Sequence, residues 1–235
     1  MYSFTIRGYH SDTVVPEYVV NRTTLPVVKH AKDLGYHVTT NLKSAFHISQ
    51  IVRPAHSIAC SIHRAFVCKD TAFRVNMFNT FVRPKLEYAS SVWSPSYKKD
   101  IEAVEAVQRR YTKRMDGLWN EPYQGRLSRL GIASLERRRL ILDLCWLYKI
   151  INGLCDIPFT SLFKYVDHCH FTRGHNRKIE TVRATADYRK HFFSVRIINT
   201  WNSLPSEIVN AQNLPLFKRK VKSLDLREHL VGEFH

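Results

Sequence analysis

The first forty residues alternate short apolar runs with residues that favour turns. In YVVNRTTLPVV, which begins at residue 18, β-branched residues flank Asn21-Arg22, and a second turn-forming stretch runs from Lys32 to Gly35. β-branched residues favour strands, and Asn and Gly favour the tight connections between strands. The pattern therefore predicts a hairpin and one further strand in this part of the chain.

Helical periodicity begins beyond the first forty residues, where apolar residues recur every three or four positions. Asn41 is the candidate N-cap of the first helix, and Pro54 is expected to kink or split that helix. Asp70 or Thr71 is the candidate cap of the next helix, whose apolar face extends to Val82. Both helices are amphipathic, so each is expected to pack one face into a core.

The stretch FVRPKLEYASSVWSP, residues 81 to 95, interrupts the second helix. Pro84 lacks an amide hydrogen and its ring collides with the preceding turn, so the helix is expected to end or bend there. Leu86, Ala89 and Trp93 have the spacing that continues an apolar face after the bend. We interpret the stretch as a bent core helix rather than a catalytic motif.

Four more helices are predicted towards the C-terminus. The second of them begins at an N-cap, Ser134, and stops at Gly153, and its positions 140 to 151 are apolar almost all round, as in a buried helix. Between the second and third lies a basic segment, residues 155 to 190, whose composition is typical of a loop. The four helices are expected at residues 98 to 115, 134 to 153, 191 to 204 and 214 to 224.

Composition narrows the class of protein. The chain has 235 residues, of which 44% are hydrophobic, so it is long enough to bury a core. Its formal net charge of +16 is the kind of field that attracts phosphate polymers or anionic headgroups. No apolar run is long enough to span a bilayer and no secretory signal precedes the domain, so we expect an intracellular protein without a membrane partner. Its five cysteines are expected to be reduced.

Positive charge gathers first at the end of the helix at 98 to 115. Cations near a helix C-terminus are favoured by the helix dipole, so a structural explanation and contact with phosphate both stay open. These candidates are Arg109, Arg110, Lys113 and Arg114.

Two further basic groups are candidates for nucleic-acid contact. Arg137, Arg138 and Arg139 lie in the first turns of their helix, where cations oppose the dipole, so each is expected to have a compensating anion: Glu136, Asp143 or a phosphate. The loop cations are expected to run along a phosphate backbone or simply to be solvated. The loop candidates are Arg173, Arg177 and Lys178.

Several long motifs occur in one order: FVRPKLEYASSVWSP, KKDIEAVEAVQRRYTKR, RLSRLGIASLERRRL, YKIINGL and FFSVRIINTWNSLPSEIV. Together, from about residue 18 to about residue 222, they resemble the C-terminal part of reverse transcriptases from non-LTR (LINE-type) retrotransposons. In that family an endonuclease, fingers and a catalytic palm precede a helical thumb and a basic C-terminal region. The resemblance implies that this chain begins after the palm, and that the palm and endonuclease belong to a missing upstream part.

The resemblance also implies a domain plan for a mainly α protein. Residues 1 to 40 would be the end of the palm, with a primer-holding turn at 33 to 36 that includes Leu34 and Gly35. Residues 41 to 153 would be a helical thumb-like domain, and residues 154 to 235 a basic C-terminal region with short helices. Such a thumb holds a template and primer duplex of RNA and DNA by its backbone, and the protein would be nuclear if functional.

The chain lacks the residues for polymerisation. Two-metal catalysis needs clustered carboxylates, which the family supplies as an aromatic-x-Asp-Asp motif, and no Asp-Asp pair occurs in this sequence. Any Mg²⁺ would belong to the missing palm, so no catalytic residue, metal ligand or cofactor is assigned to this chain. A zinc site built from His168-Cys169-His170 with Cys155 and His175 is disfavoured, because no Cys-x-x-Cys pair completes it.

Two functions are therefore expected as alternatives. The first is a fragment of an RNA-directed DNA polymerase from a transposable element, able at most to bind template and primer. The second is an independent basic helical protein, a domesticated remnant that binds nucleic acid or another protein.

Overall fold

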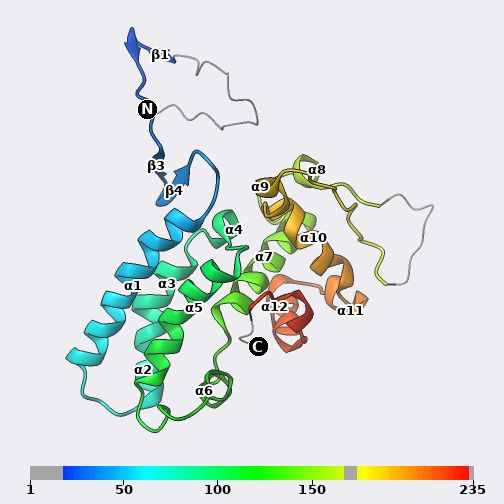
Figure 1. Cartoon of the computed structure of the whole chain (residues 1–235). Coiled ribbons are helices and arrows are strands. Elements are labelled where there is room, and N and C mark those ends of the chain that lie inside the picture. Colours follow the sequence, from blue (N-terminus) through cyan, green and yellow to red (C-terminus); the bar gives the residue numbers. More distant parts are fainter. Residues whose placement is uncertain (1–17, 167–173, 233–235) are drawn as a thin grey trace.

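A computed structural model describes residues 18–166 and 174–232 of the chain (Figure 1). It is mainly α-helical, with two small antiparallel strand pairs before the first helix, which confirms the mainly α fold. None of the helices in these residues is both long and apolar enough to cross a membrane.

Two hairpins, rather than a hairpin and one strand, precede the helices. The strands are β1 (Val19–Val20), β2 (Thr23–Thr24), β3 (His30–Asp33) and β4 (Tyr36–Thr39). Val20 pairs with Thr23 in the first hairpin, and Asp33 pairs with Tyr36 in the second. Both turns have two residues with positive φ, Asn21-Arg22 and Leu34-Gly35, as hairpin turns of type I′ require. The additional strand is β3, whose sequence HAKD contains no β-branched residue that would predict it.

Helix α1 (Ala45–Ala65) begins later than expected and is not split. Its N-cap is Ser44; the Asn41 side chain instead accepts a hydrogen bond from the backbone N–H of Lys43, 3.0 Å away, in the connection before the helix. Pro54 lies inside the continuous helix, so of the two expected outcomes, a kink or a split, the split is wrong. The buried face of α1, which includes Ile48 and Ala55, holds the helix together through packing that the local sequence cannot report.

A π-helical turn accommodates Pro84 in the second helical segment. Of the two predicted caps, Asp70 and Thr71, it is Asp70 that caps α2 (Thr71–Met77), by accepting a hydrogen bond from the Ala72 N–H. The chain continues without interruption through a π turn (Phe78–Val82) into α3 (Arg83–Glu87). A π turn widens the helix by one residue, which gives the ring of Pro84 room that a regular turn would deny it.

The real change of direction comes after α3. Ala89 has a left-handed backbone conformation, φ 51°, and is exposed, so its predicted place on the apolar face was wrong. The short helix α4 (Ser90–Trp93) then buries Trp93, whose ring N–H donates to the Tyr88 carbonyl at 2.7 Å. The Tyr88 hydroxyl donates to the Leu34 carbonyl at 3.0 Å, so this bend fastens the second hairpin to the helices.

The remaining helices follow the predicted positions closely. Helix α7 ends just before Gly153, which has φ 63°, and Ser134 caps its start by accepting from the Arg137 N–H. The local pattern did not predict the short helix α6 or the two single-turn helices in the basic loop. The bounds are α5 (Lys98–Lys113), α6 (Tyr123–Leu130), α7 (Leu135–Ile151), α8 (Phe159–Leu162), α9 (Asp187–Lys190), α10 (Phe193–Ser203), α11 (Ser206–Val209), α12 (Leu214–Ser223) and a 3-10 turn (Arg227–His229).

Two apolar cores share helix α7, which lies between the two groups of helices in Figure 1. The first core joins α1, the π turn, α3 and α5 and includes Trp93 and Leu135. The second joins α7, α10 and α12 and includes Tyr148 and Trp201. The division falls inside α7, ahead of the expected domain boundary at residue 153. Trp146, expected in the core, is 42% exposed and lies beneath the ammonium of Lys149.

The junction between the second hairpin and α1 should be sensitive to acid. His47 is buried, and its Nδ1 accepts a hydrogen bond from the His37 backbone N–H at 3.3 Å. Burial, assisted by the charge of His37, lowers the pKa of His47 from 6.5 to about 4. Between these two pH values His47 is protonated in the unfolded chain but neutral in the folded chain. The free energy of unfolding therefore falls as the pH drops from about 6.5 to about 4, by roughly 3 kcal/mol over the whole window.

Urea unfolding at a series of pH values measures this expectation. The variant His47→Phe should be less sensitive to pH across that window, whereas His229→Gln, which changes a partly exposed histidine, should keep the original slope. A His47→Phe curve with an undiminished slope would show that another group carries the acid sensitivity.

Candidate nucleic-acid interface

Helices α1 and α5 run side by side in the same direction, as Figure 1 shows. Three contacts join residues that are 54 positions apart along the chain. The Lys43 ammonium lies over the Tyr97 ring, His56 contacts Arg110, and Arg114 contacts the Cys60 sulfur. A constant offset means that the two helices keep one register from their N-terminal to their C-terminal ends.

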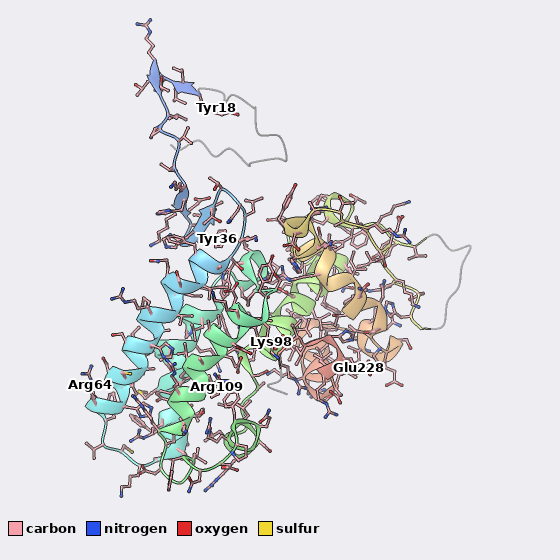
Figure 2. The ribbon with its side chains drawn as sticks, viewed as in Figure 1. Tyr18, Tyr36, Arg64, Lys98, Arg109 and Glu228 are labelled. Atoms are coloured by element: carbon pink, nitrogen blue, oxygen red, sulfur yellow. The ribbon has the colours of Figure 1, made fainter. Side chains whose placement is uncertain are left out.

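This register builds one exposed basic surface, which we call the α1/α5 face. Its members are Arg53 and Arg64 from α1, with Arg110 and Lys113 from α5 and Arg114 at the C-cap of α5. In Figure 2, Arg64 lies at the outer edge of this group of helices. The sequence of α1 contains no acidic residue, and the acids of α5 all precede Ala106. No ion pair engages any of the five cations within the residues that the structure describes.

The helix dipole explains only part of this face. Arg64, Lys113 and Arg114 lie near the C-terminal ends of two parallel helices, where cations are favoured. Arg53 lies in the middle of α1, 11 residues or about 16 Å before Arg64, and is outside the reach of that effect. Burial and the neighbouring Arg110 and Arg114 lower the pKa of His56, which disfavours its charged form. The face is therefore a strip of arginine and lysine charge long enough to meet several successive phosphates.

Three members of this face were predicted from the sequence and two were missed. Arg110, Lys113 and Arg114 are exposed and together, as the cluster predicted. Arg109, predicted with them, is half-buried and lies beside Tyr123 and Arg126 of α6 instead. The two missed members, Arg53 and Arg64, both lie on α1. The sequence of α1 contains arginines and no acidic residue, and this imbalance could have identified them.

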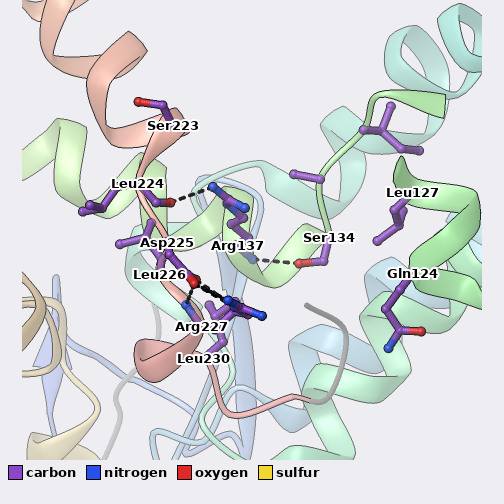
Figure 3. Close-up of a pocket in the computed structure, with 12 residues that line it drawn as sticks. Gln124, Leu127, Ser134, Arg137, Ser223, Leu224, Asp225, Leu226, Arg227 and Leu230 are labelled. Atoms are coloured by element: carbon purple, nitrogen blue, oxygen red, sulfur yellow. Dashed lines mark hydrogen bonds and ion pairs between the residues drawn. The ribbon is translucent and has the colours of Figure 1, made fainter. Parts of the chain in front are cut away.

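Arg137 and Arg138 make contacts within the protein. The Arg137 guanidinium donates to the carbonyls of Lys222 and Leu224, 2.8 and 2.9 Å away, where α12 ends. Figure 3 shows Arg137 reaching towards Leu224 in a pocket between the start of α7 and the end of α12. Arg138 forms a two-point contact with the carboxylate of Glu87 on α3. The compensating anion of Arg138 is therefore Glu87, 51 positions away, and not Glu136, Asp143 or a phosphate as expected.

Arg139 cannot contact a phosphate, so its assignment to the interface was wrong. Its side chain is fully buried among four carboxylates, and its two terminal nitrogens have no hydrogen-bond partner in the described residues. Glu105, fully buried on α5, is one of those carboxylates. Burial lowers the pKa of Arg139 and raises that of Glu105, and each opposite charge acts against the other's shift.

Besides the α1/α5 face, a basic hollow lies between α6, α7 and α12. It has a volume of about 620 Å³ and is lined in part by Arg83, Arg137, Arg138, Lys218 and Lys222. Glu87 pairs with both Arg83 and Arg138, so the hollow has less unbalanced charge than the α1/α5 face. The α1/α5 face is therefore the stronger candidate for phosphate contact.

The turn at Leu34 and Gly35, the predicted primer-holding site, is the tip of the second hairpin. Leu34 is 86% exposed at the tip of the second hairpin. Gly35 has φ 86°, and a side-chain carbon placed there would lie 3.1 Å from the Tyr88 ring. The close approach of Tyr88, from the same chain, and the positive φ therefore both favour glycine at this position.

Of the three loop cations predicted as nucleic-acid contacts, the structure describes two, Arg177 and Lys178. Arg173 lies outside the residues that the structure describes, as do Cys169 and its two flanking histidines of the disfavoured zinc site. Arg177 donates to the Asn152 side chain at 3.0 Å, and its carbonyl accepts from the Trp201 ring N–H. Lys178 is half-buried beside Gly174. In residues 18–166 and 174–232, no three His, Cys, Asp or Glu side chains gather as metal ligands would.

Comparisons with known proteins add one distant relative. An uncharacterized protein of Caenorhabditis elegans is 24% identical over 135 residues, which cover 56% of this chain and 68% of the relative. No family model matches the chain. No solved structure matches it. The relative's name assigns no activity, so the case for a function rests on the residues of the α1/α5 face and on the sequence motifs.

Proposed function

We propose that this chain is a nucleic-acid-holding fragment of a non-LTR retrotransposon reverse transcriptase, corresponding to the thumb and the region after it. The observation that carries the proposal is the α1/α5 face, where five exposed cations have no ion-pair partner among the described residues. The order of the motifs in the sequence supports the same interpretation. The polymerase palm with its Mg²⁺ site would lie upstream, so the chain by itself holds template and primer without extending them.

The chemistry of the face suits a duplex backbone. Arginine and lysine on the outer side of two rigid helices can meet phosphates, but helices lying parallel across a surface offer no side chain that reads base edges. Binding should therefore be independent of sequence and strongly dependent on salt, because each neutralised phosphate releases counterions. An RNA/DNA hybrid is the expected ligand of a reverse transcriptase thumb.

The proposal is tested by titrating a labelled RNA/DNA hybrid with the purified chain over a range of salt concentrations. We expect log Kd to change linearly with log salt, with a slope of about 3 to 5 if most of the face is engaged. A primer-extension assay with Mg²⁺ should give no product. Binding without salt dependence would contradict the phosphate contacts, and extension would contradict the inactive assignment.

A further inference from the structure

A groove lies where the N-terminal ends of α1 and α5 meet α9. Its volume is about 270 Å³, slightly below the usual range for ligand pockets. Its lining combines aromatic rings with one lysine, one histidine and several small polar side chains. Its members include Lys43, Trp93, Tyr97, Tyr188, His191 and Phe192.

Three aromatic rings of this groove stay open to solvent. The exposed fractions are 42% for Tyr97, 53% for Tyr188 and 45% for Phe192. Large rings usually lose most of their accessible surface in a folded domain, and exposed groups of them mark interaction sites. These three come from two segments that are far apart in sequence, so the fold has brought them together.

Positive charge is interleaved with the rings. The Lys43 ammonium lies 5.5 Å from the centre of the Tyr97 ring, and the Arg189 guanidinium lies 5.4 Å from the centre of the Phe192 ring. The acid in the lining, Asp187, accepts a hydrogen bond from the Tyr97 hydroxyl and pairs with His191. The neighbouring charges of Lys190 and Lys43 partly offset its negative charge. Further exposed cations on the helices α5 and α9 that border the groove are Lys99 and Lys190.

We infer that this groove holds an unpaired nucleobase of single-stranded RNA or DNA, stacked on its aromatic rings while the flanking phosphates meet the cations. Aromatic platforms within a basic groove are how proteins hold single strands, because every base has a flat face and every nucleotide a charge. A purely acidic peptide would use the cations and leave the rings exposed. The inference rests on the proposed function and names a second ligand form, the single strand that leaves a duplex.

The position of the groove supports the view that the α1/α5 face holds a duplex and the groove holds a single strand. Lys43 comes just before the N-cap of α1, and Arg53 of the α1/α5 face lies 10 residues later, about 15 Å along the helix axis. A duplex on the face can therefore continue as a single strand into the groove. Tyr188 is the most exposed of the three rings, and its hydroxyl donates no hydrogen bond within residues 18–166 and 174–232, so it is the side chain to change.

The test compares a single-stranded oligonucleotide with an abasic oligonucleotide of the same length and charge, using the full chain. We expect the oligonucleotide with bases to bind about tenfold more tightly, and Tyr188→Leu to remove most of this difference. Tyr188→Phe, which keeps the ring, should retain it. Trp146→Ala, which removes an exposed ring of α7 outside the groove, is the matched control and should also retain it.

The outcomes separate this inference from the proposed function. Equal binding of both oligonucleotides, with the hybrid still bound, would overturn the groove alone. Base-dependent binding without binding to the hybrid would support the groove and overturn the duplex-holding function. If polyglutamate displaces the oligonucleotide with bases as readily as it displaces the abasic one, the groove recognises charge only and the inference is wrong; if no oligonucleotide or hybrid binds, both proposals are wrong.

Discussion

Glu105→Ala is expected to lower the free energy of unfolding by about 3 to 5 kcal/mol, because it removes a buried hydrogen-bond acceptor together with one of the negative charges that offset the buried Arg139. The Glu105 carboxylate accepts hydrogen bonds from the Tyr123 hydroxyl, at 2.5 Å, and from the backbone N–H groups of Leu135 and Glu136. A side chain of α5 thereby caps the start of α7 and joins it to α6. The same carboxylate offsets the buried charge of Arg139.

The cost of this substitution has two sources. Alanine leaves the N–H groups at the start of α7 without their acceptor in a site that water cannot readily enter. It also leaves Arg139 with one fewer compensating charge, and an uncompensated buried charge is costly.

Urea unfolding of Glu105→Ala against Glu102→Ala measures the effect. Glu102 lies one turn earlier on α5 and is only partly buried, so its replacement should change stability by less than about 0.5 kcal/mol. Tyr123→Phe, which removes one of the donors, should fall between the two. Equal stabilities for the two glutamate variants would show that the buried network contributes little.

Replacing Arg110, Lys113 and Arg114 together with alanine is expected to reduce the salt slope of hybrid binding by about 3, which is about 1 for each phosphate that the variant no longer neutralises. Affinity at low salt should fall by more than about tenfold. The three side chains are exposed and alanine favours helices, so the fold of α5 should be preserved. Circular dichroism checks that the helices remain.

A variant with the same charge change provides the control. Lys164, Arg183 and Arg219 are exposed cations in the C-terminal part of the chain, and their joint replacement by alanine should leave the salt slope nearly unchanged. A comparable decrease of slope in both variants would mean that the whole positive surface binds phosphate, and that the α1/α5 face has no special role.

Most elements could be predicted from local pattern, but their exact continuity could not. The caps at Asp70 and Ser134 and the stop at Gly153 depend on neighbouring residues, so the sequence reports them directly. The local pattern predicts a break or a bend at Pro54 and Pro84. The fold keeps both segments helical through packing of a buried face and a π turn, and these depend on residues that are distant in sequence.

In the candidate site, too, local groupings could be predicted from the sequence and contacts between distant residues could not. Arg110, Lys113 and Arg114 could be grouped from spacing alone because they share one stretch of helix. The partners of Arg137 and Arg138 lie 85, 87 and 51 positions away, on α12, beyond its end, and on α3, and no local pattern reveals contacts over such separations. The burial of Arg139 follows from the packing of α5 against α7, which periodicity predicts only as a face and not as a neighbour.

Lysine footprinting on the hybrid-bound chain tests the central claim most directly. The chain is treated with an amine-reactive reagent with and without the RNA/DNA hybrid, and modification of each lysine is measured by mass spectrometry. We predict strong protection of Lys113 on the α1/α5 face and little protection of Lys164, which is also exposed. Unprotected Lys113 in a chain that binds the hybrid would contradict the assignment of this face as the nucleic-acid interface.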